Sequence, residues 1–175
     1  VSRDDPAASD CDGIYTKCRY SVIDSNVLID AGQAEAFINV KGGARNEGVT
    51  QPYGYTVIVS NNMLLDSQTN PTLAGVSSET NGIKIATSEV LVIGNVLDGL
   101  TESGIYTDSD AGSDAPCHNV VISGNHIKNH RGKNAIGIYG LGRRVRVEGN
   151  LIDTVSASYD TSNQNSGILI SKGGG

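Results

Sequence analysis

The stretch NVVISGNHIKN, residues 119–129, places three asparagines among β-branched residues, with a Ser-Gly step before the middle one. Val and Ile favour strands whereas Asn disfavours them, so Asn125 marks a break between two short strands. The phrase recurs as YSVIDSNVLID (20–30), YTVIVSNNMLLD (55–66), EVLVIGNVLD (89–98) and RVRVEGNLID (144–153). Such recurrence predicts a repeat architecture.

A second phrase separates the asparagine phrases. The aligned asparagines are 36, 33, 30 and 25 residues apart: Asn26, Asn62, Asn95, Asn125 and Asn150. Between them lie Gly-Ile-x-Ile phrases, namely DGIYT (12–16), NGIKI (81–85), SGIYT (103–107), IGIYG (136–140) and SGILI (166–170), with AFINV (36–40) in the remaining gap. Constant strand phrases with variable spacing indicate that insertions fall in loops while stacked layers stay the same.

Three short strands per repeat predict an all-β fold. We expect a single-stranded right-handed parallel β-helix of about five to six coils, in which each coil pairs with its neighbours about 4.8 Å away. Residues 1–175 are interpreted as one domain, with coils over 12–171 and a polar lead-in over 1–11. We also expect the chain to be a segment of a longer protein, or to rely on partners to cover its ends.

Alternation along each strand predicts which side chains point inward. One inward column comprises Ile14, Ile38, Ile83, Ile105, Ile138 and Ile168. In the strands before the asparagines, the inward residues are Ile23, Val59, Val92, Ile122 and Val147, and the outward ones are Val22, Ile58, Leu91, Val121 and Arg146. Because most of these outward residues are apolar, we expect loops or another subunit to cover part of this face.

The recurring asparagines have a structural explanation. At a corner, Asn tolerates left-handed backbone geometry, and its amide both donates and accepts hydrogen bonds. Stacked amides can form an asparagine ladder along the axis, as in cross-β structures. The preceding residues are of types that suit a tight bend: Ser25, Asn61, Gly94, Gly124 and Gly149. We therefore assign the asparagines to the architecture rather than to a functional site.

Composition limits the classes of function. The net charge of −6 argues against binding to nucleic acid. No apolar stretch of about 18 residues occurs, so no membrane span is predicted. The three cysteines, Cys11, Cys18 and Cys117, do not make a disulfide framework and have no zinc-binding spacing. A Cys11–Cys18 bridge and unpaired thiols both remain open.

The pattern NVxIxGNxI, followed by a loop and GIxI, resembles the pectate-lyase-like β-helix superfamily over residues 12–171. This superfamily includes polysaccharide lyases, galacturonan hydrolases, alginate epimerases and phage tailspike depolymerases. The resemblance implies a polysaccharide ligand along the Gly-Ile-x-Ile sheet and an extracellular or virion-associated location. The chain lacks the DPHE motif of the epimerases and the GHG and RIK motifs of the hydrolases. The resemblance therefore implies a fold and a substrate class rather than a reaction.

The outward x position of the Gly-Ile-x-Ile strands predicts a substrate-binding groove. Tyrosine offers a flat apolar face and a hydroxyl, which suit a sugar ring, although tyrosines also simply fill half-exposed strand positions. Arg143 is expected at the groove edge, where an anionic sugar could use it, and His130 and Arg131 are the other basic candidates for substrate binding. The predicted column comprises Tyr15, Asn39, Lys84, Tyr106, Tyr139 and Leu169.

Glycoside hydrolysis is one reaction that these residues allow. It needs two carboxyl groups about 5–9.5 Å apart. The predicted catalytic pair is Asp108 with Glu102 or Glu79.

Elimination from a uronic-acid polymer is the other reaction. A base must remove the C5 proton after the sugar carboxylate has been neutralised. Lys84 with Tyr106 or Tyr139 is the candidate set, and His130, Arg131 or Arg143 would assist. Burial between tyrosines is expected to lower the pKa of the lysine.

A calcium site is a further candidate. Asp108, Asp110 and Asp114 supply hard oxygen ligands in one loop, but without the full EF-hand pattern. A solvated acidic loop explains the same residues. Neither reaction requires a cofactor.

Two functions follow from the sequence. The first is a polysaccharide depolymerase of tailspike or secreted bacterial type. The second is a non-catalytic structural or adhesive β-helix of a virion appendage or cell surface. A homotrimer would suit the partly apolar outer face.

Overall fold

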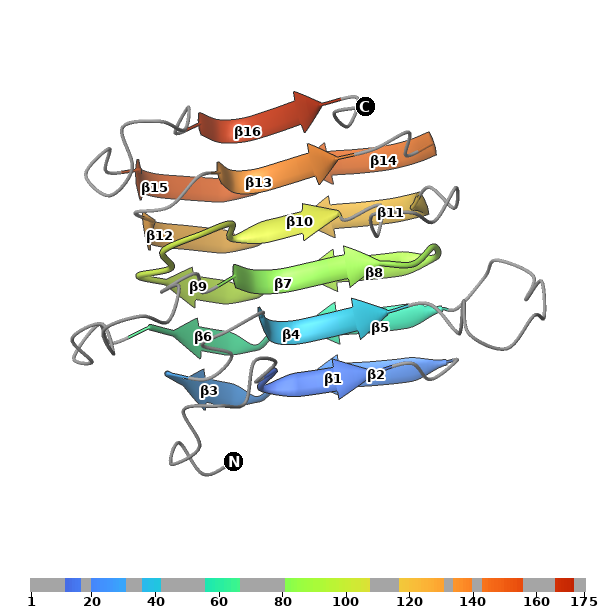
Figure 1. Ribbon diagram of the computed structural model, residues 1–175, viewed down its shortest axis with the longest axis horizontal. Helices are drawn as coiled ribbons and strands as arrows, with labels where there is room; N and C mark the ends of the chain where they lie inside the picture. Colours follow the sequence, from blue (N-terminus) through green and yellow to red (C-terminus); the bar gives the residue numbers. More distant parts are fainter. Residues whose placement is uncertain are drawn as a thin grey trace, which may run out of the picture.

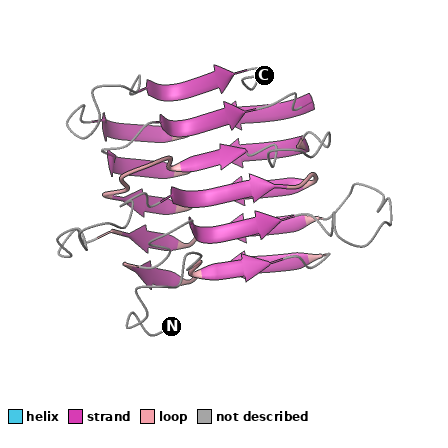
Figure 2. Ribbon diagram, viewed as in Figure 1, coloured by secondary structure: helices cyan, strands magenta, loops and turns pink. Residues whose placement is uncertain are grey.

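The structure, a computed structural model, describes residues 12–16, 20–30, 36–41, 56–66, 81–107, 117–130, 134–139, 143–155 and 166–171. Within these ranges it contains sixteen β-strands and no helix (Figure 1, Figure 2). Several residues singled out above lie outside the described ranges: Cys11, Cys18, Glu79, Asp108, Asp110, Asp114 and Arg131.

The strands form three parallel sheets, and successive strands of the chain belong to different sheets. Sheet A contains β1 (Ile14–Thr16), β4 (Ala36–Lys41), β7 (Asn81–Ala86), β10 (Ile105–Thr107), β13 (Asn134–Tyr139) and β16 (Ser166–Ser171). Sheet B contains β2 (Ser21–Asp24), β5 (Val57–Ser60), β8 (Val90–Ile93), β11 (His118–Ser123) and β14 (Arg143–Glu148). Sheet C contains β3 (Val27–Ile29), β6 (Met63–Leu65), β9 (Val96–Asp98), β12 (His126–His130) and β15 (Leu151–Val155).

The predicted right-handed parallel β-helix is confirmed. Each strand pairs with the strand that lies three positions further along the chain. This arrangement gives five coils of three strands, followed by β16 (Figure 1). Because each layer repeats the same three strands, side chains at equivalent positions stack in columns about 4.8 Å apart.

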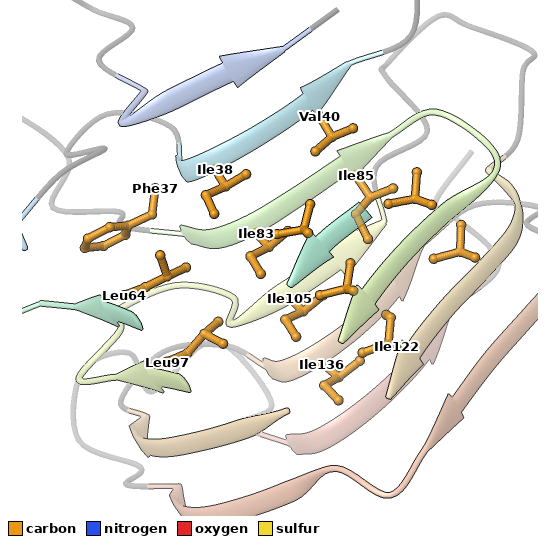
Figure 3. Close-up of a cluster of buried hydrophobic side chains, with 14 of the residues drawn as sticks. Phe37, Ile38, Val40, Leu64, Ile83, Ile85, Leu97, Ile105, Ile122 and Ile136 are labelled. Atoms are coloured by element: carbon orange, nitrogen blue, oxygen red, sulfur yellow. The ribbon is translucent and has the colours of Figure 1, made fainter. Parts of the chain in front are cut away.

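The core fills the interior of the coils. Ile38, Ile83, Ile105 and Ile136 are fully buried in one column, and Figure 3 shows them stacked beside the second column of Val40 and Ile85. In β16 the inward side chains of Ile168 and Ile170 are 48% and 78% exposed, because no further strand of the described chain packs on them.

The structure corrects the register of β13. Ile105 pairs with Ile136 rather than with Ile138, and Ile136 pairs in turn with Ile168. Ala135 therefore takes the position of the repeat glycine, and Gly137 takes the outward x position predicted for Tyr139. Both registers keep isoleucine inward, since a shift of two residues preserves the face on which each side chain lies.

The asparagine ladder is confirmed. Each ladder Nδ2 donates to the Oδ1 of the asparagine in the next coil at 2.9 Å, from Asn26 through Asn62, Asn95 and Asn125 to Asn150. The backbone N–H of each donor residue bonds to the same oxygen at 3.0 Å. The side chains thus satisfy backbone groups at a corner where the sheet ladder is interrupted.

The backbone at this corner differs from the expectation. The left-handed conformation belongs to the residue before each ladder asparagine and not to the asparagine itself. Positive φ angles occur at Ser25, Asn61, Gly94, Gly124 and Gly149, between 54° and 66°. The bend is therefore made one residue earlier, which leaves the ladder amide free to point along the axis.

Alternation in sheet B agrees with the prediction. The predicted inward residues Ile23, Val59, Val92 and Ile122 are buried, and Val147 is half-buried. Among the outward residues, Val22 is 65% exposed, whereas Ile58, Leu91 and Val121 are half-buried. The outward column of sheet B is thus apolar and in part accessible from Val22 to Val121, and it ends at the exposed Arg146.

Candidate functional site

The candidate site is the outer face of sheet A, where the strand register builds two outward columns. The first column comprises Tyr15, Asn39, Lys84, Tyr106, Gly137 and Leu169. The second contains the pairs Lys41–Ala86 and Tyr139–Ser171. Five steps of about 4.8 Å separate Tyr15 from Leu169, so this face is about 24 Å long.

Two lysines on this face lie against tyrosine rings. Lys84 Nζ is 5.8 Å from the ring centroid of Tyr106, its direct neighbour in register. Lys41 Nζ is 5.6 Å from the ring centroid of Tyr15, one strand away. Both distances fall within the range of a cation–π interaction. The two lysines are on adjacent strands, β4 and β7, and the tyrosines flank them.

Charge on this face is opposite in sign to that of the chain. The outward strand residues of sheet A within the described ranges include Lys41 and Lys84 and no carboxylate, whereas the whole chain carries a net charge of −6. Asp12, which precedes β1, binds Asn39 at the strand edge. Lys41 and Lys84 thus place two cations on the adjacent strands β4 and β7, although the net charge of the chain is negative.

Tyr106, whose ring lies beside Lys84, forms an aromatic pair with Tyr139. Their ring centroids are 6.3 Å apart, and the ring planes are inclined at 80°. This edge-to-face arrangement is favourable for two aromatic rings. Although the backbone of Tyr139 lies two residues beyond its predicted position, its ring extends back over Gly137, into the column where the sequence had placed it.

Asn39 does not contribute an exposed amide to this face. It is fully buried, and its Nδ2 donates to Asp12 Oδ2 at 3.0 Å. Its expected substrate contact therefore does not fit its position. Alternation predicts that the Asn39 side chain points outward, but it does not predict whether another part of the chain buries that side chain.

His130 also differs from its expected role. It is fully buried at the end of β12, where it is in register with Val155 of β15. Within the described part of the chain, neither ring nitrogen has a hydrogen-bond partner of normal geometry. Burial lowers the pKa of His130 to about 4, and the Asn134 backbone only partly opposes this shift. The ring is thus a neutral core group rather than a substrate contact.

The remaining candidates contribute less to the described face. Glu102 precedes β10 and is 9% exposed. Arg143 begins β14 and pairs with His118, so its backbone belongs to sheet B. The proposed carboxylate partners Glu79 and Asp108 lie outside the described residues, as does Arg131.

The described residues contain no group of three or more His, Cys, Asp or Glu side chains that could hold a metal ion. The aspartates of the predicted calcium site lie outside those residues. Cys117 is buried, and its Sγ–H donates to the Ile85 carbonyl at 3.3 Å. In the part of the chain that the structure describes, no helix is long and apolar enough to span a membrane.

Lys41 was not among the residues predicted from the sequence. It lies two residues after Asn39, and alternation alone places both on the same face. Asn134 and Thr107, which form hydrogen bonds with Tyr139, could not be found in this way because these contacts depend on the register of β13. In comparisons with known proteins, no family model, curated protein or solved structure matches this chain.

Proposed function

We propose that the outer face of sheet A binds an acidic polysaccharide. The observation that carries the proposal is the pairing of Lys41 with Tyr15 and of Lys84 with Tyr106 on one continuous face. Lysine ammonium groups suit sugar carboxylates, and tyrosine rings suit the apolar faces of sugar rings. The likeness of the repeat to the pectate-lyase-like superfamily supports the same substrate class.

The regular spacing of this face also supports an extended ligand. Its outward positions recur about every 4.8 Å over about 24 Å, which suits a polymer better than a compact small molecule. On such a face, successive sugars of one polymer can each make the same weak contacts. The protein would then act outside the cell or on a virion, where such polymers are found.

Elimination is the cleavage reaction that the described residues fit best. In this reaction a base removes the C5 proton, the C4–O4 bond breaks, a C4=C5 double bond forms and O4 leaves with a proton. Lys84 and Tyr106 offer a cation for the carboxylate and groups able to move a proton. Hydrolysis would need Asp108 paired with Glu102 or with Glu79, and Glu102 is buried.

A structural or adhesive β-helix is the second candidate. It is favoured by apolar side chains on the outer faces of sheets B and C, where Val22, Val27, Ile29, Met63 and Leu151 are exposed. Exposed apolar columns suit packing against another subunit, including a homotrimer.

Product analysis separates these possibilities. The protein is incubated with polygalacturonate, alginate and hyaluronate, and both ultraviolet absorbance and reducing ends are recorded. A new ultraviolet band from the unsaturated sugar indicates elimination, whereas reducing ends without this band indicate hydrolysis. Binding without either product supports a non-catalytic β-helix, and absence of binding to all three polymers contradicts the proposed function.

A further inference from the structure

Gly137 leaves a space on sheet A that the ring of Tyr139 occupies. A Cβ atom at Gly137 would lie 2.6 Å from Cε2, 3.2 Å from Cζ and 3.3 Å from the hydroxyl oxygen of Tyr139. A carbon cannot approach so closely, so any side chain at this position would displace the phenol. The missing side chain thus determines where the Tyr139 ring can lie.

The two ends of Tyr139 are fixed independently. Its hydroxyl accepts a hydrogen bond from Asn134 Nδ2 at 2.5 Å, and Asn134 Oδ1 accepts one from Ser166 Oγ at 2.6 Å. Its backbone N–H donates to Thr107 Oγ1 at 3.0 Å, and that hydroxyl donates to the Tyr139 carbonyl at 3.2 Å. The ring is therefore held in one orientation, edge-on to Tyr106, before any ligand arrives.

Polarity divides the face into two halves. The lysines lie on β4 and β7, whereas the outward residues described on β10, β13 and β16 are uncharged: Tyr106, Gly137, Tyr139, Leu169 and Ser171. Lys84 and Tyr106 meet at the boundary. A ligand along the face would thus pass from a cationic half to an uncharged aromatic half within one layer.

We propose that Gly137 is a positioning residue that seats Tyr139 next to Tyr106 and so creates an uncharged aromatic subsite for one sugar ring beside the lysines. This inference rests on the proposed polysaccharide binding and narrows its substrate class. The preferred polymer contains an acidic sugar adjacent to a neutral one. Tyr139 supplies the ring contact in this subsite, and Gly137 acts only through Tyr139.

The effect of Gly137 on the position of the Tyr139 ring is tested without ligand by a double-mutant cycle. Gly137→Ala displaces the ring, so the near-ultraviolet circular dichroism of the Tyr106–Tyr139 pair falls toward that of Tyr139→Ala. Glycine weakens a strand, so in the Tyr139→Ala background the same Gly137→Ala change raises the melting temperature. Gly167→Ala is the matched control, because its Cβ would meet only Ile152 Cδ1 at 3.8 Å.

The cycle has two informative outcomes. The proposed role of Gly137 is supported if Gly137→Ala lowers the melting temperature of the wild type but raises that of Tyr139→Ala, while the dichroism of Gly167→Ala is unchanged. Equal effects of Gly137→Ala with and without the Tyr139 ring, or dichroism that does not respond to either substitution, would overturn it.

The subsite is tested by binding of hyaluronate, which alternates acidic and neutral sugars, and of polygalacturonate, in which every sugar is acidic. We expect Tyr139→Ala and Gly137→Ala each to weaken hyaluronate binding about tenfold and to affect polygalacturonate less. Tyr139→Phe, which keeps the ring but loses the hydrogen bond from Asn134, should bind hyaluronate between Tyr139→Ala and the wild type. Hyaluronate binding that survives Tyr139→Ala unchanged would overturn the subsite while leaving the proposed function standing. Failure of the wild type to bind hyaluronate, polygalacturonate or alginate would overturn both.

Discussion

Asn95 Nδ2 donates to Asn125 Oδ1 at 2.9 Å, and both side chains are fully buried one coil apart. Asn95 also donates to the Val59 carbonyl and accepts from the backbone and side chain of Asn62. One amide thus joins three coils. Because all its partners are shielded from water, the ladder is a place where a small change in sequence has a large effect on stability.

Asn95→Ala is expected to lower the free energy of unfolding by about 3–5 kcal/mol, because several buried donors and acceptors lose their partner together. Asn26→Ala, at the partly exposed end of the ladder, is expected to cost less. Urea denaturation of both variants measures the difference. Equal costs at the two positions would contradict the role of burial in the ladder.

Two glycines of sheet A are expected to respond oppositely to alanine. At Gly104 a Cβ would lie 2.4 Å from the Ala135 carbonyl oxygen, which belongs to the backbone of the next coil. Gly104→Ala should therefore destabilise the protein by about 3 kcal/mol or more, as overpacking against a backbone does. Gly167→Ala, whose nearest atom is 3.8 Å away, should be neutral or slightly stabilising. Thermal unfolding of the two variants distinguishes a tight coil-to-coil contact from a general intolerance of alanine.

Stability is expected to fall between pH 6.5 and 4 because of His130. Its pKa is about 4 when folded, against an ordinary value of 6.5 for histidine, so the unfolded chain binds the proton more readily in this window. The stabilising contribution is complete above pH 6.5 and decreases as the pH falls toward 4, by up to about 3 kcal/mol.

His130→Leu isolates this contribution. The variant should lose the slope of unfolding free energy against pH in that window, since leucine fills this buried position without a titratable group. Asp24 does not interfere, because hydrogen bonds from Ser60, Ser25 and Asn61 hold its pKa below 3.8. The same slope in wild type and variant would show that another group titrates.

Much of the fold could be predicted from the sequence because each coil carries its own marker. The Gly-Asn, Ser-Asn or Asn-Asn corner sets the register of sheets B and C, since a slip of one residue would turn the inward Val and Ile side chains outward. In sheet A, the run Ala135 to Tyr139 fits two registers that differ by two residues and bury isoleucine equally well. The contact of the Tyr139 ring with Gly137 and the hydrogen bonds between Tyr139 and Thr107 belong to the observed register, and such contacts are not visible in a pattern.

The site was less predictable for a related reason. Alternation identified Tyr15, Lys84 and Tyr106 as neighbours on one face, and the register confirms this. The burial of Asn39 and His130 depends on what packs against them, which strand periodicity does not encode. Lys41 could have been predicted by extending the alternation two residues further along its strand.

The central claim, an acidic polysaccharide on the outer face of sheet A, is tested most directly by calorimetric titration of a Lys41→Met, Lys84→Met double variant with polygalacturonate at low salt. We expect the double variant to bind at least about tenfold more weakly than the wild type, because two cations on adjacent strands are lost. Lys128→Met, which removes a lysine paired with Asp98 at 3.1 Å on sheet C, should bind like the wild type. If both variants are folded and the double variant binds as tightly as the wild type, the acidic polysaccharide does not bind on the outer face of sheet A.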